Sequence, residues 1–206
     1  NAGLSKAYNA ALQVLKGQTD YVIWADDDTR FPADYFEKLA FYAEKHPDAD
    51  LFLPVVKSQS VILSPAVYTQ RIVYPVQELD QLEGKEITAI NSGLVVSMSV
   101  YEDYSYDEAI FLDYVDHDLL CWCRENGKKL CIMKDVELLQ SFFNESIPTR
   151  AARKHRLNIY KKDIRVFEAK HGKNRLLTEY DLLRHRYFEW RDLMRRIIRA
   201  KIKKNK

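Results

Sequence analysis

The sequence predicts an α/β fold, in which helices flank a mostly parallel sheet and a basic helical segment follows. Two patterns in the first 56 residues indicate this class. Helical periodicity alternates with strand-length apolar runs, and these runs lack the in–out alternation of strands that face water on one side. The length of 206 residues suits one domain, or one domain with a small appendage.

Each early element has a local signal. Apolar residues recur at helical spacing from Leu4 to Leu15, and Gly17 ends the pattern. Pro32 suits the first turn of a second helix, where a backbone N–H is not needed. The predicted order is a helix over 4–16, a strand over 21–25, a helix over 33–45 and a strand over 51–56.

The later elements are shorter. Pro65 and Pro75 indicate irregular structure over residues 57–90. Gly93 lies inside a predicted third strand, where a glycine often marks the close approach of a ligand or another chain. The remaining prediction is a strand over 90–98, a helix over 116–124 ended by Asn126-Gly127, short strands over 130–133 and 136–139, and helices from Pro148 onward.

The composition excludes several classes of protein. With 47% hydrophobic and 30% charged residues, the chain is globular and not disordered. Apolar runs such as Leu51–Val56 are too short to cross a bilayer, so no transmembrane helix is expected. The three cysteines, Cys121, Cys123 and Cys131, do not make a disulfide framework. Without a secretion signal they favour a reducing cytoplasm and buried thiols.

The charge is divided unevenly along the chain. Residues 1–149 carry 12 Lys and Arg against 24 Asp and Glu, whereas residues 150–206 carry 20 against 6. Such a basic segment favours an anionic surface. Helical spacing of Tyr187 and Trp190 among many arginines suits the surface of an anionic membrane, and a contact with the domain or a second subunit is the alternative.

The first chemical feature is the run Asp26-Asp27-Asp28 directly after an apolar strand. Ligands bind at the carboxyl ends of strands in open α/β sheets. Asp26 and Asp28 point the same way on an extended segment and could together hold Mg²⁺ or Mn²⁺. The alternative is an acidic cluster at a helix N-terminus. Because aspartate pairs also serve phosphatases and nucleotidyltransferases, the spacing alone leaves the reaction open.

The second feature is the group Asp113, Asp116 and Asp118 at the start of a predicted helix. A carboxylate fixed at such a junction can act as a general base. Equally, these residues can cap the helix and fill a solvated first turn.

Together these features resemble family-2 glycosyltransferases of the GT-A fold, above all the branch that transfers rhamnose and galactofuranose. The resemblance covers roughly residues 1–145. It rests on four segments in the family's order: Asn1–Asn9, Trp24–Pro32 with its Asp-x-Asp signature, Asn91-Ser-Gly93, and Phe111–Asp118 followed by Arg124 and Gly127.

The resemblance implies roles for single residues. Asp26 would lie near the ribose and diphosphate of the donor, Asp28 would bind the metal, and Asp116 would deprotonate the acceptor hydroxyl. The transfer would be inverting, from a UDP- or dTDP-linked sugar to a glycan or lipid-linked acceptor in bacterial surface polysaccharide synthesis. The implied sites are Asn1, Gly3, Asp26 and Asp27 for the donor, Ser92, Gly93, Asp118 and Trp122 for the acceptor, and Asp26 and Asp28 for Mn²⁺ or Mg²⁺.

The sequence also departs from the family's pattern. The family's domain normally starts with a strand–helix–strand unit that grips the nucleotide base, and this sequence begins after the place where that unit should end. We therefore expect a partial catalytic domain over 1–147 and a basic helical extension over 148–206. Gln140 stands where many relatives have a histidine that can join the metal site.

Other functions stay open at this point. A nucleotidyl- or phosphotransferase could use the Asp26/Asp28 pair, and the basic tail could belong to a non-catalytic module that binds polyanions. No nucleic acid partner is expected, because the body is acidic and no known binding motif occurs. The expected location is the cytoplasm, at the inner face of the plasma membrane if the basic helix binds lipid, and a homodimer is the alternative use of that helix.

Overall fold

The computed structural model describes residues 2–26, 29–58, 61–69, 72–139, 149–172 and 174–204. The elements predicted over residues 4–56 and the helix predicted over 116–124 lie within two residues of their observed positions, whereas the strand predicted over 90–98 covers only residues 94–97. The elements are α1 (Leu4–Leu15), β1 (Tyr21–Trp24), α2 (Tyr35–Lys45), β2 (Leu51–Ser58), β3 (Val61–Thr69), β4 (Ile72–Val76), the 3-10 turn η1 (Leu79–Leu82), β5 (Ile87–Thr88), β6 (Leu94–Ser97), the 3-10 turn η2 (Met98–Glu102), α3 (Val115–Glu125), β7 (Leu130–Leu139), α4 (Arg150–Lys170) and α5 (Arg175–Lys204).

The chain divides into two compact units. The sheet unit comprises Lys6–Tyr106 and Val115–Phe142, and the helical unit comprises Asn1–Ser5, Asp107–Tyr114 and Phe143–Lys206. The helical unit therefore includes more than the C-terminal helices. It takes in the loop over residues 107–114, which leads directly into α3.

The α/β class is confirmed, but the prediction of a mostly parallel sheet is wrong. The strand order is β1-β6-β2-β3-β4, with β5 paired to β3 and β7 paired to β2. In the described chain only the β2–β7 pairing is parallel. Two causes are visible. β6 enters between β1 and β2 antiparallel to both, and β3 starts three residues after β2 ends, too close for a parallel crossover.

The prediction of irregular structure over residues 57–90 is also wrong, since β3, β4 and β5 lie there. That prediction rested on Pro65 and Pro75, which lie within β3 and β4. A proline is tolerated on an edge strand, and β4, which contains Pro75, pairs only with β3. The two short strands expected over 130–139 form one strand, β7, whose pairing with β2 shifts register between Pro54 and Val55.

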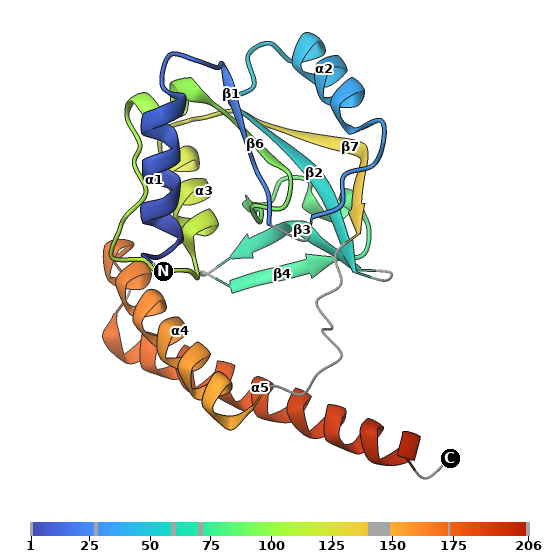
Figure 1. The fold of residues 1–206 in the computed structure, drawn as a ribbon, viewed down its shortest axis with the longest axis vertical. Helices are drawn as coiled ribbons and strands as arrows, with labels where there is room; N and C mark the ends of the chain where they lie inside the picture. The colour runs from blue at the N-terminus through green and yellow to red at the C-terminus, as the bar shows by residue number, and fades with distance from the viewer. Residues whose placement is uncertain are drawn as a thin grey trace. The chain divides into compact units, whose positions relative to one another are not determined.

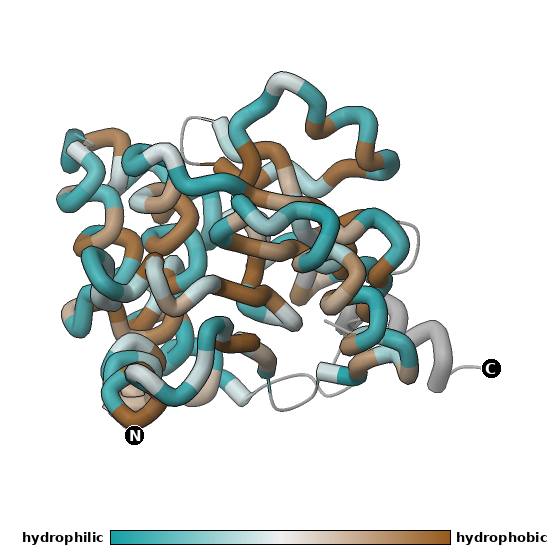
Figure 2. Tube along the Cα trace, turned by 90° about the horizontal axis from the view of Figure 1, so that it is seen from above, coloured by the Kyte–Doolittle hydropathy of each residue, from teal (hydrophilic) through white to brown (hydrophobic). Residues whose placement is uncertain are grey.

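Helices cover both faces of the sheet in the sheet unit (Figure 1). α1 and α3 lie together on one side, and α2 lies on the other. The hydropathy colouring in Figure 2 shows apolar residues gathered on the inner strands. The core under α2 is built from Tyr35 of α2 with strand residues Phe52, Val56, Val95, Met133, Val136 and Leu138.

The cysteines follow the sequence-based expectation in part. Cys121 and Cys123 are buried free thiols, and Cys131 is partly buried. Burial raises the pKa of the Cys123 thiol to about 12. Among the described residues, no helix combines the length and hydropathy needed to cross a bilayer.

Candidate functional site

The floor of the candidate site is a layer of aromatic side chains in the sheet unit. Trp24, the last residue of β1, stacks on Tyr8 of α1 with ring centroids 3.9 Å apart. Its Nε1 donates a hydrogen bond of 2.7 Å to the Tyr101 hydroxyl, which lies 2.9 Å from that of Tyr106. Because buried indole and phenol groups need such partners, these contacts fix the end of β1 firmly.

Asp26 follows this layer, at the carboxyl end of β1. Its side chain is exposed, and its Oδ2 accepts a hydrogen bond of 2.8 Å from the hydroxyl of Ser92. Ser92 itself is only 2% exposed. A buried hydroxyl that donates to an exposed carboxylate orients it, as outer partners orient metal ligands.

Asp116 lies in the first turn of α3, where the positive end of the helix dipole favours a carboxylate. Its Oδ1 accepts a hydrogen bond of 2.8 Å from the backbone N–H of His117. The His117 ring is held in turn, because its Nδ1 lies 2.7 Å from Oγ1 of Thr88 on β5. The His117 side chain is therefore mostly buried, with 15% of it exposed.

The Tyr8 hydroxyl links the two carboxylates electrostatically. Burial raises the pKa of Tyr8 most, and the negative charges of Asp26 and Asp116 raise it further. A hydrogen bond with the Asn91 side chain acts in the opposite direction. Side chains from α1, the end of β1, the segment before β6 and α3 thus lie close enough to act on one another electrostatically.

Asp118 of α3 is buried and Trp122 of the same helix is partly buried, whereas a group that contacts an acceptor must reach the surface. Asp118 is 1% exposed, and its Oδ2 accepts a hydrogen bond of 2.9 Å from the Tyr104 hydroxyl. Trp122 packs against the same tyrosine, with ring centroids 5.3 Å apart. A buried carboxylate can influence an acceptor only through its neighbours, so the acceptor role of Asp118 stays a prediction.

The two glycines among the proposed site residues are required by packing. Gly3 has φ +96°, and a Cβ there would lie 2.8 Å from Cδ2 of Phe111. Gly93 has φ +74°, and a Cβ there would lie 2.6 Å from Cδ1 of Leu138. Close approach was expected at Gly93, and the structure shows that the neighbour is the protein's own side chain. Their donor and acceptor roles remain predictions.

Of the two predicted metal ligands, the structure describes Asp26 but not Asp28. Asn1, Asp27, Asp28 and Gln140 lie outside the described residues. Within the described ranges, no group of three or more His, Cys, Asp or Glu residues could hold a metal ion.

Comparison with known proteins decides the family. A model of glycosyl transferase family 2 matches residues 1–105, half of the chain. The chain belongs to glycosyl transferase family 2.

The chain is also similar to a named glycosyltransferase. The chain is 25% identical over 160 residues to a dTDP-rhamnosyl transferase, RfbF, of Shigella flexneri. The match covers 71% of this chain and 51% of the relative, so the chain spans about half the length of the relative. The family match includes Asp26, Ser92 and Gly93 but ends before Asp116.

Sequence reasoning missed three residues of the candidate site. Tyr8 was assigned to the apolar face of a helix, and Thr88 lay in a region expected to be irregular. Asn91 was part of a quoted motif without a role of its own. Its place in a predicted strand was a possible signal, because a polar side chain there needs a partner. Asn91 is 6% exposed, and its Oδ1 has no hydrogen-bond partner among the described residues.

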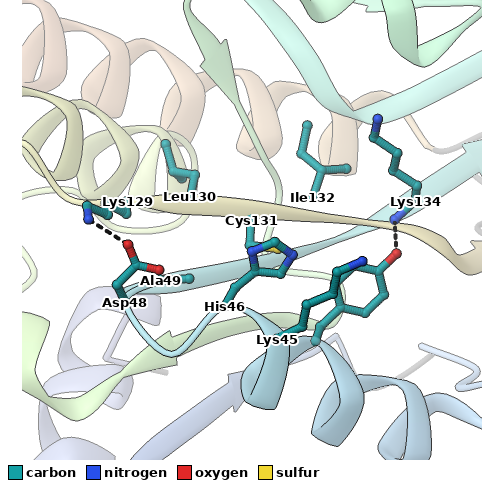
Figure 3. A pocket seen from close by; sticks show the side chains of 10 residues that line it. Lys45, His46, Asp48, Ala49, Lys129, Leu130, Cys131, Ile132 and Lys134 are labelled. Carbon is teal, nitrogen blue, oxygen red and sulfur yellow. Dashed lines mark hydrogen bonds and ion pairs between the residues drawn. The ribbon is translucent and has the colours of Figure 1, made fainter.

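A pocket lies elsewhere in the sheet unit (Figure 3). It encloses about 750 Å³ and is lined by Lys45, His46, Lys129 and Lys134 among others. It sits where β2 and β7 begin. β1 runs in the same direction as β2, since β6 is antiparallel to both, so Asp26 lies at the opposite edge of the sheet. Of the predicted site residues that the structure describes, none lines this pocket.

Proposed function

We propose that the protein is a metal-dependent, inverting glycosyltransferase that moves a sugar from a dTDP-linked donor to a glycan or lipid-linked acceptor. The pathway would be the synthesis of a bacterial surface polysaccharide. The observation that carries this proposal is that the charges of Asp26 and Asp116, which we propose as the donor-side and acceptor-side carboxylates, both act on the Tyr8 hydroxyl. Family membership and the similarity to a dTDP-rhamnosyl transferase support it.

In this proposal Asp116 is the general base. As the acceptor hydroxyl attacks the anomeric carbon, the Asp116 carboxylate takes its proton, and the bond from that carbon to the diphosphate breaks on the opposite face. One base and no enzyme nucleophile suffice for such a direct displacement, which inverts the configuration. The N–H of His117 and the helix start hold the carboxylate in place.

The residues present fit a hard divalent cation that the donor helps to bind. Asp26 offers a carboxylate oxygen in an exposed position and is oriented by Ser92. Mg²⁺ and Mn²⁺ take oxygen ligands and are commonly held by one or two carboxylates together with substrate phosphates and water. Asp26, with Asp28, would hold the metal, which when bound would neutralise the departing dTDP.

Calorimetric titration of the full-length protein with dTDP and UDP, each with and without Mn²⁺, tests the donor site. We expect dTDP to bind only with the metal and UDP to bind at least about tenfold more weakly, because a site that contacts the base discriminates between them. An Asp26→Asn variant should lose the increase in dTDP affinity that Mn²⁺ gives. Metal-independent binding, or no binding of either nucleotide, would contradict the proposal.

The membrane partner rests on α5. All but Leu177 of its described large exposed apolar residues recur at spacings of three and four and form a stripe along one side of the helix. The stripe consists of Leu176, Tyr180, Leu183, Tyr187, Trp190 and Met194. Thr178 and Leu182, on the opposite side of the helix, are buried. Aromatic residues at the centre of such a stripe suit the interface between lipid and water.

The charges beside the stripe favour an anionic lipid surface over a second copy of the chain. Arg184 and Arg191 follow one side of it and Arg186 the other. In a parallel pair of α5 helices, Arg186 would face Arg191 of the partner helix, and like charges at such positions repel. On an anionic membrane each arginine contributes about 1 kcal/mol. We therefore propose that the protein works at the inner face of the plasma membrane.

Vesicle flotation checks this proposal. The protein should float with vesicles of phosphatidylglycerol and not with phosphatidylcholine alone, and Tyr187→Ser/Trp190→Ser should reduce the bound fraction at least about tenfold. Phe36→Ser, an exposed aromatic of α2, is the matched control that should still float. Equal binding by all variants, or a dimer in sedimentation that the double substitution dissolves, would overturn it.

A further inference from the structure

The 107–114 loop places the proposed base. It ends at Tyr114, one residue before α3 begins, and Asp116 is the second residue of that helix. Tyr114 has φ +68°, a left-handed conformation that side chains other than glycine rarely adopt. Such a conformation persists only where the surroundings hold it. In this loop the surroundings come from α4.

Asp163 of α4 holds the backbone of the loop. Its Oδ1 accepts a hydrogen bond of 3.0 Å from the N–H of Phe111, and its Oδ2 accepts bonds of 2.8 and 2.9 Å from the N–H groups of Leu112 and Asp113. Asp163 is 0% exposed. A buried carboxylate is costly unless it is fully hydrogen-bonded, and three successive N–H groups that converge on one anion supply that compensation.

The side chains of the loop are held by the same helix. The Tyr114 hydroxyl lies 2.9 Å from that of Tyr160, and the Tyr114 ring stacks on Phe167 with centroids 4.8 Å apart. Arg156 forms a two-pronged ion pair with Asp113. The backbone N–H groups of residues 111–113 and the side chains of Asp113 and Tyr114 are thus all held by α4, and the left-handed residue lies at the end of this stretch.

We infer that Asp163 is a positioning residue for transfer, because it sets where α3 begins and hence where the Asp116 carboxylate lies. The inference rests on the proposed function, in which Asp116 is the base. The basic C-terminal part of the chain then supports catalysis in addition to the membrane binding proposed for α5. Asp163 acts through the loop and does not touch the substrate.

Asp163→Asn in the full-length protein tests this inference. An amide keeps the shape but turns an NH₂ group toward at least one of the three N–H donors. We expect turnover to fall about tenfold or more, since small displacements of a reacting group are costly. The KM for the donor and the dTDP affinity should stay within about twofold of wild type. Turnover is counted per dTDP-binding site, so that a loss of folded protein does not imitate a loss of positioning.

Glu179→Gln is the matched control, since it removes a carboxylate that pairs with Arg165 of α4 away from the loop, and it should keep wild-type turnover. If Asp163→Asn does not fold, Tyr160→Phe replaces it, and its turnover per site should fall at least about threefold. Wild-type turnover per site in the folded variant would overturn the inference. Wild-type turnover in Asp116→Asn would overturn the proposed function instead.

Discussion

Asp116→Asn should reduce sugar transfer at least about 100-fold and leave dTDP binding unchanged. The amide oxygen can still accept the hydrogen bond from the His117 N–H, so the start of α3 keeps its geometry. The amide cannot take up the proton of the acceptor hydroxyl. The loss should therefore appear in turnover, measured with a saturating donor, and not in the calorimetric affinity for dTDP with Mn²⁺.

Glu125→Gln is the control for this experiment. Glu125 is an exposed residue at the other end of the same helix, so its substitution makes the same change of charge far from the first turn. It should keep wild-type turnover. Near-wild-type transfer by Asp116→Asn would show that another group accepts the proton.

Gly93→Ala should lower the free energy of unfolding by about 2–4 kcal/mol, from the left-handed backbone and from overpacking together. The new Cβ would lie 2.6 Å from Cδ1 of Leu138 and 3.3 Å from Cγ of Pro54. Both neighbours are buried strand residues with little room to move. Urea unfolding followed by tryptophan fluorescence measures the change.

Gly127→Ala separates the two contributions. Gly127 has φ +65°, and nothing lies within 4 Å of a Cβ built there, so this variant carries the backbone cost alone. That cost is about 1–2 kcal/mol. If Gly93→Ala unfolds at the same urea concentration as Gly127→Ala, the steric argument at Gly93 is wrong.

The elements with strong local signals could be predicted from sequence. The periodicity of α1, the apolar run of β1 and the stop at Gly17 are properties of neighbouring residues, and the structure places these elements as expected. The direction of the sheet was not local. The residues near β1 and β2 carry no signal that β6, which lies far along the chain, is placed between them. Propensity alone also treats Pro75 as a breaker, although an edge strand tolerates it.

The candidate site divides in the same way. Asp26 and Asp116 stand out in the sequence because charged residues directly beside apolar runs are unusual. Tyr8 does not stand out, since a tyrosine on the apolar face of a helix looks like an ordinary core residue. Asp163 was hidden among many charged residues, and only the structure shows that its carboxylate is buried against backbone N–H groups.

The pairing of β2 with β7 has a consequence for how the protein reaches its native state. β2 is bordered along most of its length by β7, which comes after the end of the segment that the family model matches. The core under α2 also needs Met133, Val136 and Leu138 of β7. During synthesis the first half of the chain therefore waits for residues made much later. Such long-range closure slows folding and leaves apolar strands open to association in the meantime. Residues 1–105, which the family model matches, accordingly lack part of their own core without β7.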